Sequence, residues 1–133
     1  MPYIQTLDKQ WSLSMDINPA GTVQGLSNII HIGTGGDQGV YGYRTPAIMF
    51  YPGTTRLQIT SAINGETPYS INDCHTGPDT TIDIHRWTNV VVMQVLVLNG
   101  YQFIVKLNGL PVFSVYNTDP QEFENVKVSS SYN

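Results

Sequence analysis

Polar and aromatic side chains gather in a glycine-rich stretch between residues 31 and 44. The stretch begins with His31 and continues as Gly35-Gly36-Asp37-Gln38-Gly39-Val40-Tyr41-Gly42-Tyr43-Arg44. Sugar hydroxyls require paired donors and acceptors, and the apolar face of a sugar ring stacks on aromatic rings. We interpret the stretch as a carbohydrate-binding loop whose candidate ligand-binding residues are His31, Asp37, Gln38, Tyr41, Tyr43 and Arg44. The alternative is a connector whose glycines only permit tight turns.

A second polar stretch runs from Asn64 to Tyr69, and Asn72-Asp73-Cys74-His75 and His85-Arg86-Trp87 follow it. Its candidate ligand-binding residues are Asn64, Glu66, Tyr69 and Trp87. For Trp87 the favoured interpretation is a core residue at the start of the next strand. If this stretch packs beside the glycine-rich one, the two form a single binding rim, which the spacing alone does not establish.

Catalytic patterns are missing from the sequence. Glycoside hydrolases need two carboxylates, either about 5 to 5.5 Å or roughly 6.5 to 9.5 Å apart. Asp16 stands alone in its strand, and neither Asp79 with Asp83 nor Glu122 with Glu124 forms a recognisable acid pair. No Gly-x-Ser-x-Gly elbow and no zinc-type histidine spacing occurs. We therefore predict a protein that is not an enzyme and has no metal-ligand cluster.

The composition narrows the range of partners. Charged residues make up only 12% of the 133 residues, about half the usual share, which suits neutral glycans as ligands. Six scattered Lys and Arg and a net charge of -4 leave no basic stripe for nucleic acid. No apolar run reaches the roughly 18 residues of a membrane span, so no membrane insertion is expected. The length predicts a single domain over residues 1–133.

The N-terminal sequence and the single cysteine bear on the compartment in which the protein acts. Met1-Pro2-Tyr3 opens directly into polar sequence without an apolar signal region. We expect a secreted or extracellular protein, with a cytoplasmic location as the alternative. Cys74 is the single cysteine, which excludes an internal disulfide. It is expected to be a buried or idle thiol, and an intermolecular bridge is the alternative.

Short strands and frequent turns must position these loops. Residues 87–116 predict a three-stranded antiparallel meander, because Asn99-Gly100 and Asn108-Gly109 are typical of two-residue type I′ turns. Trp11 to Ile17 alternates apolar and polar residues, as a half-buried strand does. Further strands are predicted at Ile29–Ile32, Ala47–Tyr51, Leu57–Ile63, Thr81–Ile84 and Phe123–Ser130. Nine or ten strands must bury their apolar faces, so we predict an all-β, antiparallel two-sheet β-sandwich.

The order of these elements resembles the concanavalin A-like lectin and glucanase superfamily, particularly its laminin-G-like members. The resemblance rests on Trp11-x-Leu-x-Met-Asp-Ile17, Asn28-Ile-Ile-His-Ile-Gly33, Gly42-x-Arg44-x-Pro-Ala-Ile48, Leu57-x-Ile59, Arg86-Trp87 and Phe103-x-Val105-x-Leu-Asn-Gly109 with Phe113 beyond. It implies a jelly roll with one curved sheet, whose concave face and rim loops bind carbohydrate or protein. Members include hydrolases, legume lectins, galectins, pentraxins and adhesion modules, so the fold alone does not decide the function.

The resemblance also bears on cofactors and binding motifs. His31 lacks the companion Asn and Arg of a galectin site, and the acid cluster that binds metals in legume lectins is not recognisable. We expect no cofactor, although a single Ca²⁺ held by loop carbonyls with Asp37 or Asp73 would match some laminin-G-like modules.

Glycans or glycoproteins are therefore the expected partners, and from class frequency we expect a neutral glycan that contains galactose. The alternative function is an extracellular protein-protein adhesion or structural module of laminin-G-like type. Because single sugar sites are shallow, lectins gain avidity from several copies. We therefore expect a homodimer or higher homo-oligomer, formed through edge strands or sheet backs such as the apolar strand Val90 to Leu98.

Overall fold

A computed structural model describes residues 2–25 and 27–130. Within these residues the secondary structure is ten β-strands without a helix. The strands are β1 (Tyr3–Leu7), β2 (Trp11–Ile17), β3 (Ser27–Gly33), β4 (Ala47–Phe50), β5 (Leu57–Ile63), β6 (Glu66–Ser70), β7 (Thr88–Val97), β8 (Gly100–Leu107), β9 (Leu110–Asn117) and β10 (Phe123–Ser130). It follows that no helix in the described residues is long and apolar enough to cross a membrane.

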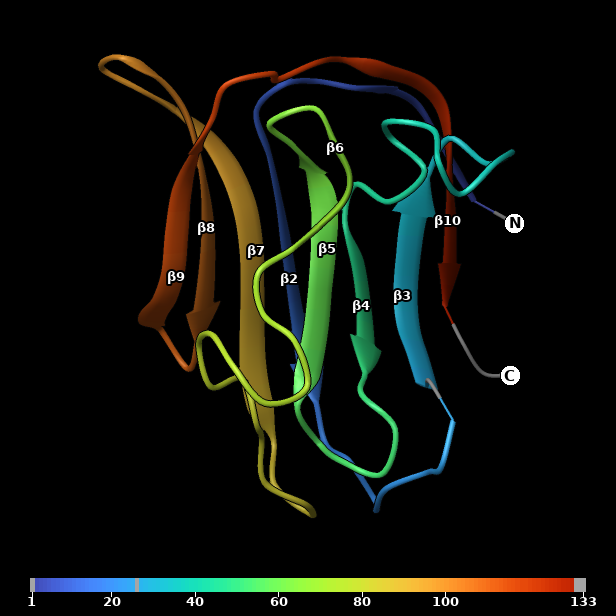
Figure 1. Cartoon of the computed structure of the whole chain (residues 1–133), viewed down its shortest axis with the longest axis vertical. Helices are drawn as coiled ribbons and strands as arrows, with labels where there is room; N and C mark the ends of the chain where they lie inside the picture. The colour runs from blue at the N-terminus through green and yellow to red at the C-terminus, as the bar shows by residue number, and fades with distance from the viewer. Residues whose placement is uncertain (1, 26, 131–133) are drawn as a thin grey trace.

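The strands form two sheets (Figure 1). One sheet has six strands in the order β1-β10-β3-β4-β5-β6, and the other has four in the order β2-β7-β8-β9. All neighbouring strands pair antiparallel. The chain is thus an all-β, antiparallel two-sheet β-sandwich, as the sequence predicted.

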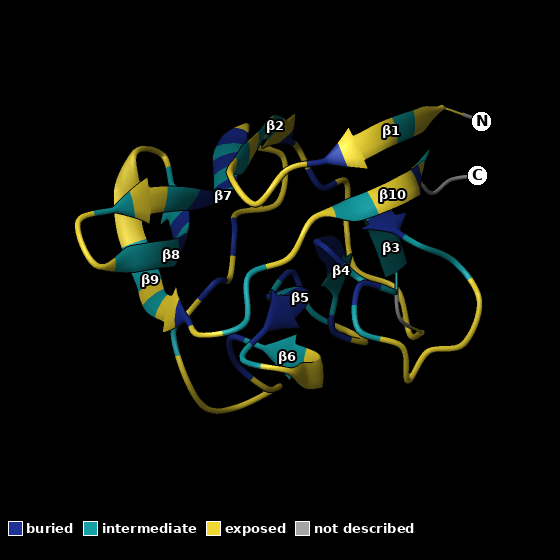
Figure 2. Cartoon of the chain, turned by 90° about the horizontal axis from the view of Figure 1, so that it is seen from above, coloured by how far each residue is buried: buried dark blue, intermediate teal, exposed yellow. Residues whose placement is uncertain are grey.

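The core lies between the two sheets and is built from alternate residues of each strand. The six-stranded sheet contributes Ile48, Leu57, Ile59 and Ile63, and the four-stranded sheet contributes Ile17, Val90, Val92, Phe103 and Val105. The ring of Trp11 meets that of Phe103 edge-on, with centroids 6.2 Å apart. A smaller cluster of Leu7, Ile32 and Val126 lies under β1 and β10. In Figure 2, β5 is buried over most of its length, whereas much of β1 is exposed.

The predicted meander is present as β7, β8 and β9, but one of its turns lies one residue away from its predicted place. Asn108 and Gly109 have φ values of 51° and 81°, which is typical of a type I′ turn. At the other turn Val97 pairs with Gly100, so that Leu98 and Asn99 are the central residues. Gly100 has a φ of 139° and begins β8, whereas Asn99 does not have a positive φ. The prediction of a type I′ turn at Asn99-Gly100 was therefore wrong.

Three other segments differ from the prediction. Thr81–Ile84 is not a strand, because only Thr81 pairs, in an isolated bridge with Arg56. The segment instead lies beside the start of β5, where it exchanges backbone hydrogen bonds with residues 55–57, and Ile82 packs into the core. β1 and β6 were not predicted, and both are edge strands. β6 carries Pro68, which an edge strand tolerates because a missing backbone N–H there breaks no ladder.

Candidate functional site

The two polar stretches lie at the same end of the six-stranded sheet. Since β3, β4, β5 and β6 alternate in direction, the connection after β3 and the β5–β6 turn both lie at this end. They meet around a narrow hollow of about 10 Å³, which is lined by residues of both stretches, among them Gln38, Tyr43, Arg44 and Glu66. The two stretches therefore form a single rim, which the sequence alone did not establish.

A wider basin lies on the other side of Tyr43. It has a volume of about 180 Å³ and is lined by His31, Gly33, Gly35, Gly36, Tyr43, Lys127 and Ser129. Lys127 and Ser129 belong to β10, which lies beside β3 (Figure 1) with Lys127 opposite Gly33 and Ser129 opposite His31. This volume is smaller than the roughly 300 to 1,000 Å³ that is usual for drug-sized ligands, so the basin is a small, open site.

His31, Tyr43 and Arg44 form a fixed unit between the basin and the hollow. The Nε2 of His31 lies 2.6 Å from the Tyr43 carbonyl oxygen, which can only accept, so Nε2 is the donor. The two rings meet edge-on with centroids 4.9 Å apart. The Arg44 guanidinium carbon lies 5.4 Å from the centre of the Tyr43 ring, a distance that allows a cation–π interaction. The orientation of the Tyr43 ring is thus set from both sides.

The floor of the basin requires a glycine at position 33. A Cβ at this position would lie 1.7 Å from the Tyr43 carbonyl oxygen and 3.1 Å from Nε2 of His31. No side chain fits into that space. The absence of a Cβ at Gly33 therefore allows the connection after β3 to cross directly over the strand.

The narrow hollow contains two buried polar atoms that need a partner. Arg44 Nε and Ser61 Oγ are both buried, and neither has a hydrogen-bond partner among the described residues. Both residues line the hollow, which has room for a water-sized group. Because buried polar atoms are nearly always paired, a bound water or a small polar group of a ligand is expected here.

Three predicted site residues serve mainly to hold the loops in place. The Tyr41 hydroxyl donates to the Asp119 carbonyl at 2.7 Å, and burial raises the pKa of Tyr41. The Asn64 side-chain oxygen accepts from the backbone N–H of Thr118 at 2.8 Å. The Tyr69 ring packs beside Phe113, and burial also raises its pKa. Because Tyr41, Asn64 and Tyr69 are engaged in these contacts, the exposed polar side chains among the predicted rim residues are Asp37, Gln38 and Glu66.

Trp87 does not belong to the rim, and it is not a core residue either. Its side chain is 70% exposed. It precedes Thr88, which pairs with Ile17 at the end of β7 opposite the rim. Gln94 lies at the end of β7 that is near the rim, because its side chain accepts a hydrogen bond from Asn117, which in turn accepts one from Asn64 in the β5–β6 turn. Gln94 lies six residues after Thr88 along the strand, which corresponds to about 20 Å. The interpretation of Trp87 as a core residue was therefore wrong, because no neighbouring strand in the described residues extends beyond Thr88 to cover the ring.

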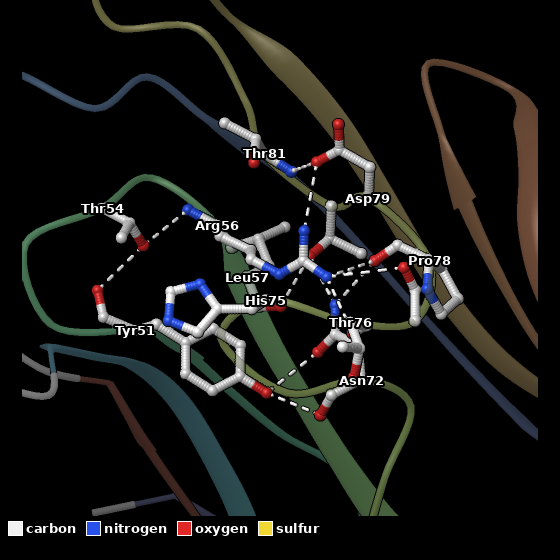
Figure 3. Close-up of polar contacts among 12 residues, drawn as sticks. Tyr51, Thr54, Arg56, Leu57, Asn72, His75, Thr76, Pro78, Asp79 and Thr81 are labelled. Atoms are coloured by element: carbon white, nitrogen blue, oxygen red, sulfur yellow. Dashed lines mark hydrogen bonds and ion pairs between the residues drawn. The ribbon is translucent and has the colours of Figure 1, made fainter.

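The loop that carries Asp73 is built around an arginine (Figure 3). Arg56, whose side chain is only 11% exposed, donates to the carbonyl oxygens of Asp73 (2.9 Å), Thr76 (2.9 Å) and Pro78 (3.1 Å). Its guanidinium also lies 3.4 Å from the Asp79 carboxylate. The carbonyls that a calcium ion would need are thus already bonded to an internal cation.

Asp73 itself is also engaged. Its carboxylate accepts from the backbone N–H and the hydroxyl of Thr76, each at 2.7 Å, and from the His75 N–H at 3.0 Å. These hydrogen bonds, that from the Thr76 side chain first, lower the pKa of Asp73 to about 2. The loop does not fit a calcium site, and the described residues contain no group of three metal-ligating side chains. Cys74 in the same loop is exposed rather than buried.

Sequence reasoning missed Lys127, Ser129 and Ser61. Lys127 and Ser129 alternate with Val126 and Val128 on β10, so their side chains were predictable as outward-facing. That they lie beside His31 depends on the pairing of β10 with β3, for which the sequence offers no local signal.

The fold and the site together define a two-sheet jelly roll with a basin at one rim. No protein-family model matches the chain, and no curated protein matches its sequence. Among solved structures it is similar to a native heptameric SAP-like pentraxin from Limulus polyphemus, with a TM-score of 0.57 and 17% sequence identity. The similarity covers 95% of this chain and 54% of the pentraxin chain. At 17% identity this similarity establishes the fold alone. Pentraxins are among the members of the superfamily that the sequence resembles.

Proposed function

We propose that this chain is a non-catalytic carbohydrate-binding protein, a lectin, in which residues 1–133 act as one binding domain. The observation that carries the proposal is the basin beside Tyr43, where an aromatic ring fixed by His31 and Arg44 adjoins a polar rim. An aromatic ring among hydrogen-bonding groups is the arrangement that sugars require. We further propose that the protein acts outside the cell on glycans or glycoproteins.

The pentraxin fold agrees with a binding role, since pentraxins are among the binding proteins of the superfamily that the sequence resembles. The low charge of the chain favours recognition through hydroxyl groups. The proposed site is one without calcium, because the carbonyl oxygens of the Asp73 loop accept hydrogen bonds from Arg56 and Asp37 lines neither the hollow nor the basin.

A glycan-array screen of the purified chain tests the proposal, with the Arg44→Ala variant in parallel. Removing the guanidinium frees the Tyr43 ring and enlarges the hollow, so we expect at least a tenfold loss of glycan binding, about 1.4 kcal/mol or more. Arg86→Ala is the matched control, because Arg86 is exposed beside Trp87 at the opposite end. Each variant is first checked for an unchanged thermal unfolding profile.

Two results would count against the proposal. Binding that Arg44→Ala leaves intact would place the sugar elsewhere on the molecule. An absence of binding to every glycan on the array, with and without calcium, would favour the second candidate function, a protein-protein adhesion module. A specific observation supports that candidate: the β7–β8 turn extends away from the sheets (Figure 1) and exposes Leu96 and Leu98, the latter to 96%.

We also propose that the chain forms a homodimer or higher oligomer through the back of the four-stranded sheet. On β7 the residues Val90, Val92 and Gln94 face the core, whereas Val91, Met93, Val95 and Val97 lie half-buried on the outer face. These four residues form an apolar stripe that is flanked by Ser12 and Ser14 on β2 and by Gln102 and Lys106 on β8. The pentraxin of similar fold is itself heptameric. Sedimentation velocity of Met93→Lys against the unchanged chain is expected to show dissociation to monomers. A monomer at all concentrations of the unchanged chain would exclude the interface.

A further inference from the structure

The basin is lined by a cation and by no acid. Its lining includes the Lys127 ammonium and the His31 imidazole, and no carboxylate is among the seven residues that form it. Lys127 has no carboxylate within ion-pair distance in the described part of the chain. Asp37, the acid of the adjacent loop, is exposed and does not line the basin. In a chain of net charge -4, this basin is therefore a local positive site.

The glycine-rich connection adds backbone donors beside the ammonium. Gly35 and Gly36 both have a φ of 79°, a region that other residues adopt at a cost. Neither of their N–H groups donates a hydrogen bond to any other described residue. A Cβ at Gly35 would lie 4.0 Å from Lys127 Nζ, so the ammonium lies beside Gly35, and Gly36 lines the same basin. Free backbone N–H groups beside a lysine are typical of anion-binding sites.

We propose that the basin binds the anionic substituent of an acidic saccharide, a carboxylate or a sulfate ester, with Lys127 as its counter-ion. The inference rests on the proposed function and refines it, because the low overall charge of the chain by itself predicted neutral glycans. The Tyr43 ring and the rim hold the neutral part of the sugar, and Lys127 with Gly35 and Gly36 holds the charged group. Ser129, opposite His31, adds a hydroxyl to the same wall.

The test compares matched glycans that differ only in the charged group: a neutral oligosaccharide, its carboxylated form and its sulfated form. Binding is measured for the unchanged chain, for Lys127→Met and for Lys127→Arg. Charge-assisted hydrogen bonds predict that Lys127→Met weakens acidic-glycan binding about tenfold and leaves neutral-glycan binding within about twofold. Lys127→Arg keeps the charge and is expected to retain most of the preference. Raising the salt from about 50 to 500 mM is expected to weaken acidic-glycan binding several-fold.

Lys9→Met is the matched control and is expected to change nothing, because Lys9 is exposed between β1 and β2 and lines neither the basin nor the hollow. Preference for the carboxylated or for the sulfated glycan identifies which anion is recognised, and either result supports the proposal. Equal binding of neutral and acidic glycans, unaffected by Lys127→Met, would overturn the anion site and leave the lectin proposal intact. An absence of binding to all three glycans and to the array would overturn both.

Discussion

Replacing Gly33 with alanine is expected to lower the free energy of unfolding by about 3 kcal/mol and to abolish ligand binding at the basin. The new methyl carbon would lie 1.7 Å from the Tyr43 carbonyl oxygen and 2.6 Å from its carbonyl carbon. Both contacts are with backbone, so no side-chain rotation can relieve them. The connection after β3 must move away from the strand, which breaks the 2.6 Å contact between His31 and Tyr43. Chemical denaturation and a glycan titration measure the two effects.

Gly39→Ala provides a matched control in the same connection. A Cβ at Gly39 would meet nothing within 4 Å, and Gly39 does not have a positive φ. We expect its stability to match that of the unchanged chain within about 0.5 kcal/mol. Normal stability and normal binding in Gly33→Ala would show that the strand and the Tyr43 backbone are not in the close contact described, and would remove the basin floor from the site.

The fold was predictable because its signals are local. Asn108-Gly109 forms a two-residue turn whose φ values its own residues determine. In β2 the alternation from Trp11 to Ile17 is sufficient to indicate which face is buried. These features depend on neighbours along the chain, and the strand boundaries they predicted at β2, β5 and β10 agree with the structure.

The site was only partly predictable because it depends on pairing between distant strands. The sequence identified His31, Tyr43 and Arg44 as a group, and the structure brings these three together. Lys127 joins them only through the register of β10 against β3. For Trp87 the sequence suggested burial, because a large apolar residue directly precedes a strand. Whether the ring is covered depends on where the neighbouring strand ends, and β2 pairs with β7 only as far as Thr88.

The anchoring of the rim depends on a buried amide at the end of β9. The side-chain nitrogen of Asn117 donates to the Ala62 carbonyl at 3.0 Å and to the Gln94 side chain at 2.8 Å. Its side-chain oxygen accepts from the backbone N–H groups of Asn64 at 3.0 Å and Asp119 at 2.9 Å. One side chain thus joins the four-stranded sheet to the turn that precedes Glu66.

Asn117→Ala is expected to lower the free energy of unfolding by about 4 kcal/mol, because it leaves four polar groups without partners in a buried place. It is also expected to loosen the β5–β6 turn, so that the amides of residues 64–66 exchange with solvent faster than in the unchanged chain. Chemical denaturation and hydrogen exchange measure these effects.

Asn99→Ala is the control for this prediction, since Asn99 is exposed at the β7–β8 turn and its stability is expected to change by less than about 0.5 kcal/mol. Asn117→Asp separates the two halves of the network. It keeps the oxygen that accepts from Asn64 and Asp119, but it places a second acceptor against the oxygens of Ala62 and Gln94. We therefore expect Asn117→Asp to be strongly destabilised at neutral pH and to recover part of its stability in acid, where a protonated carboxyl can donate. A pH-independent effect equal to that of alanine would mean that water, rather than Asn117, satisfies these groups.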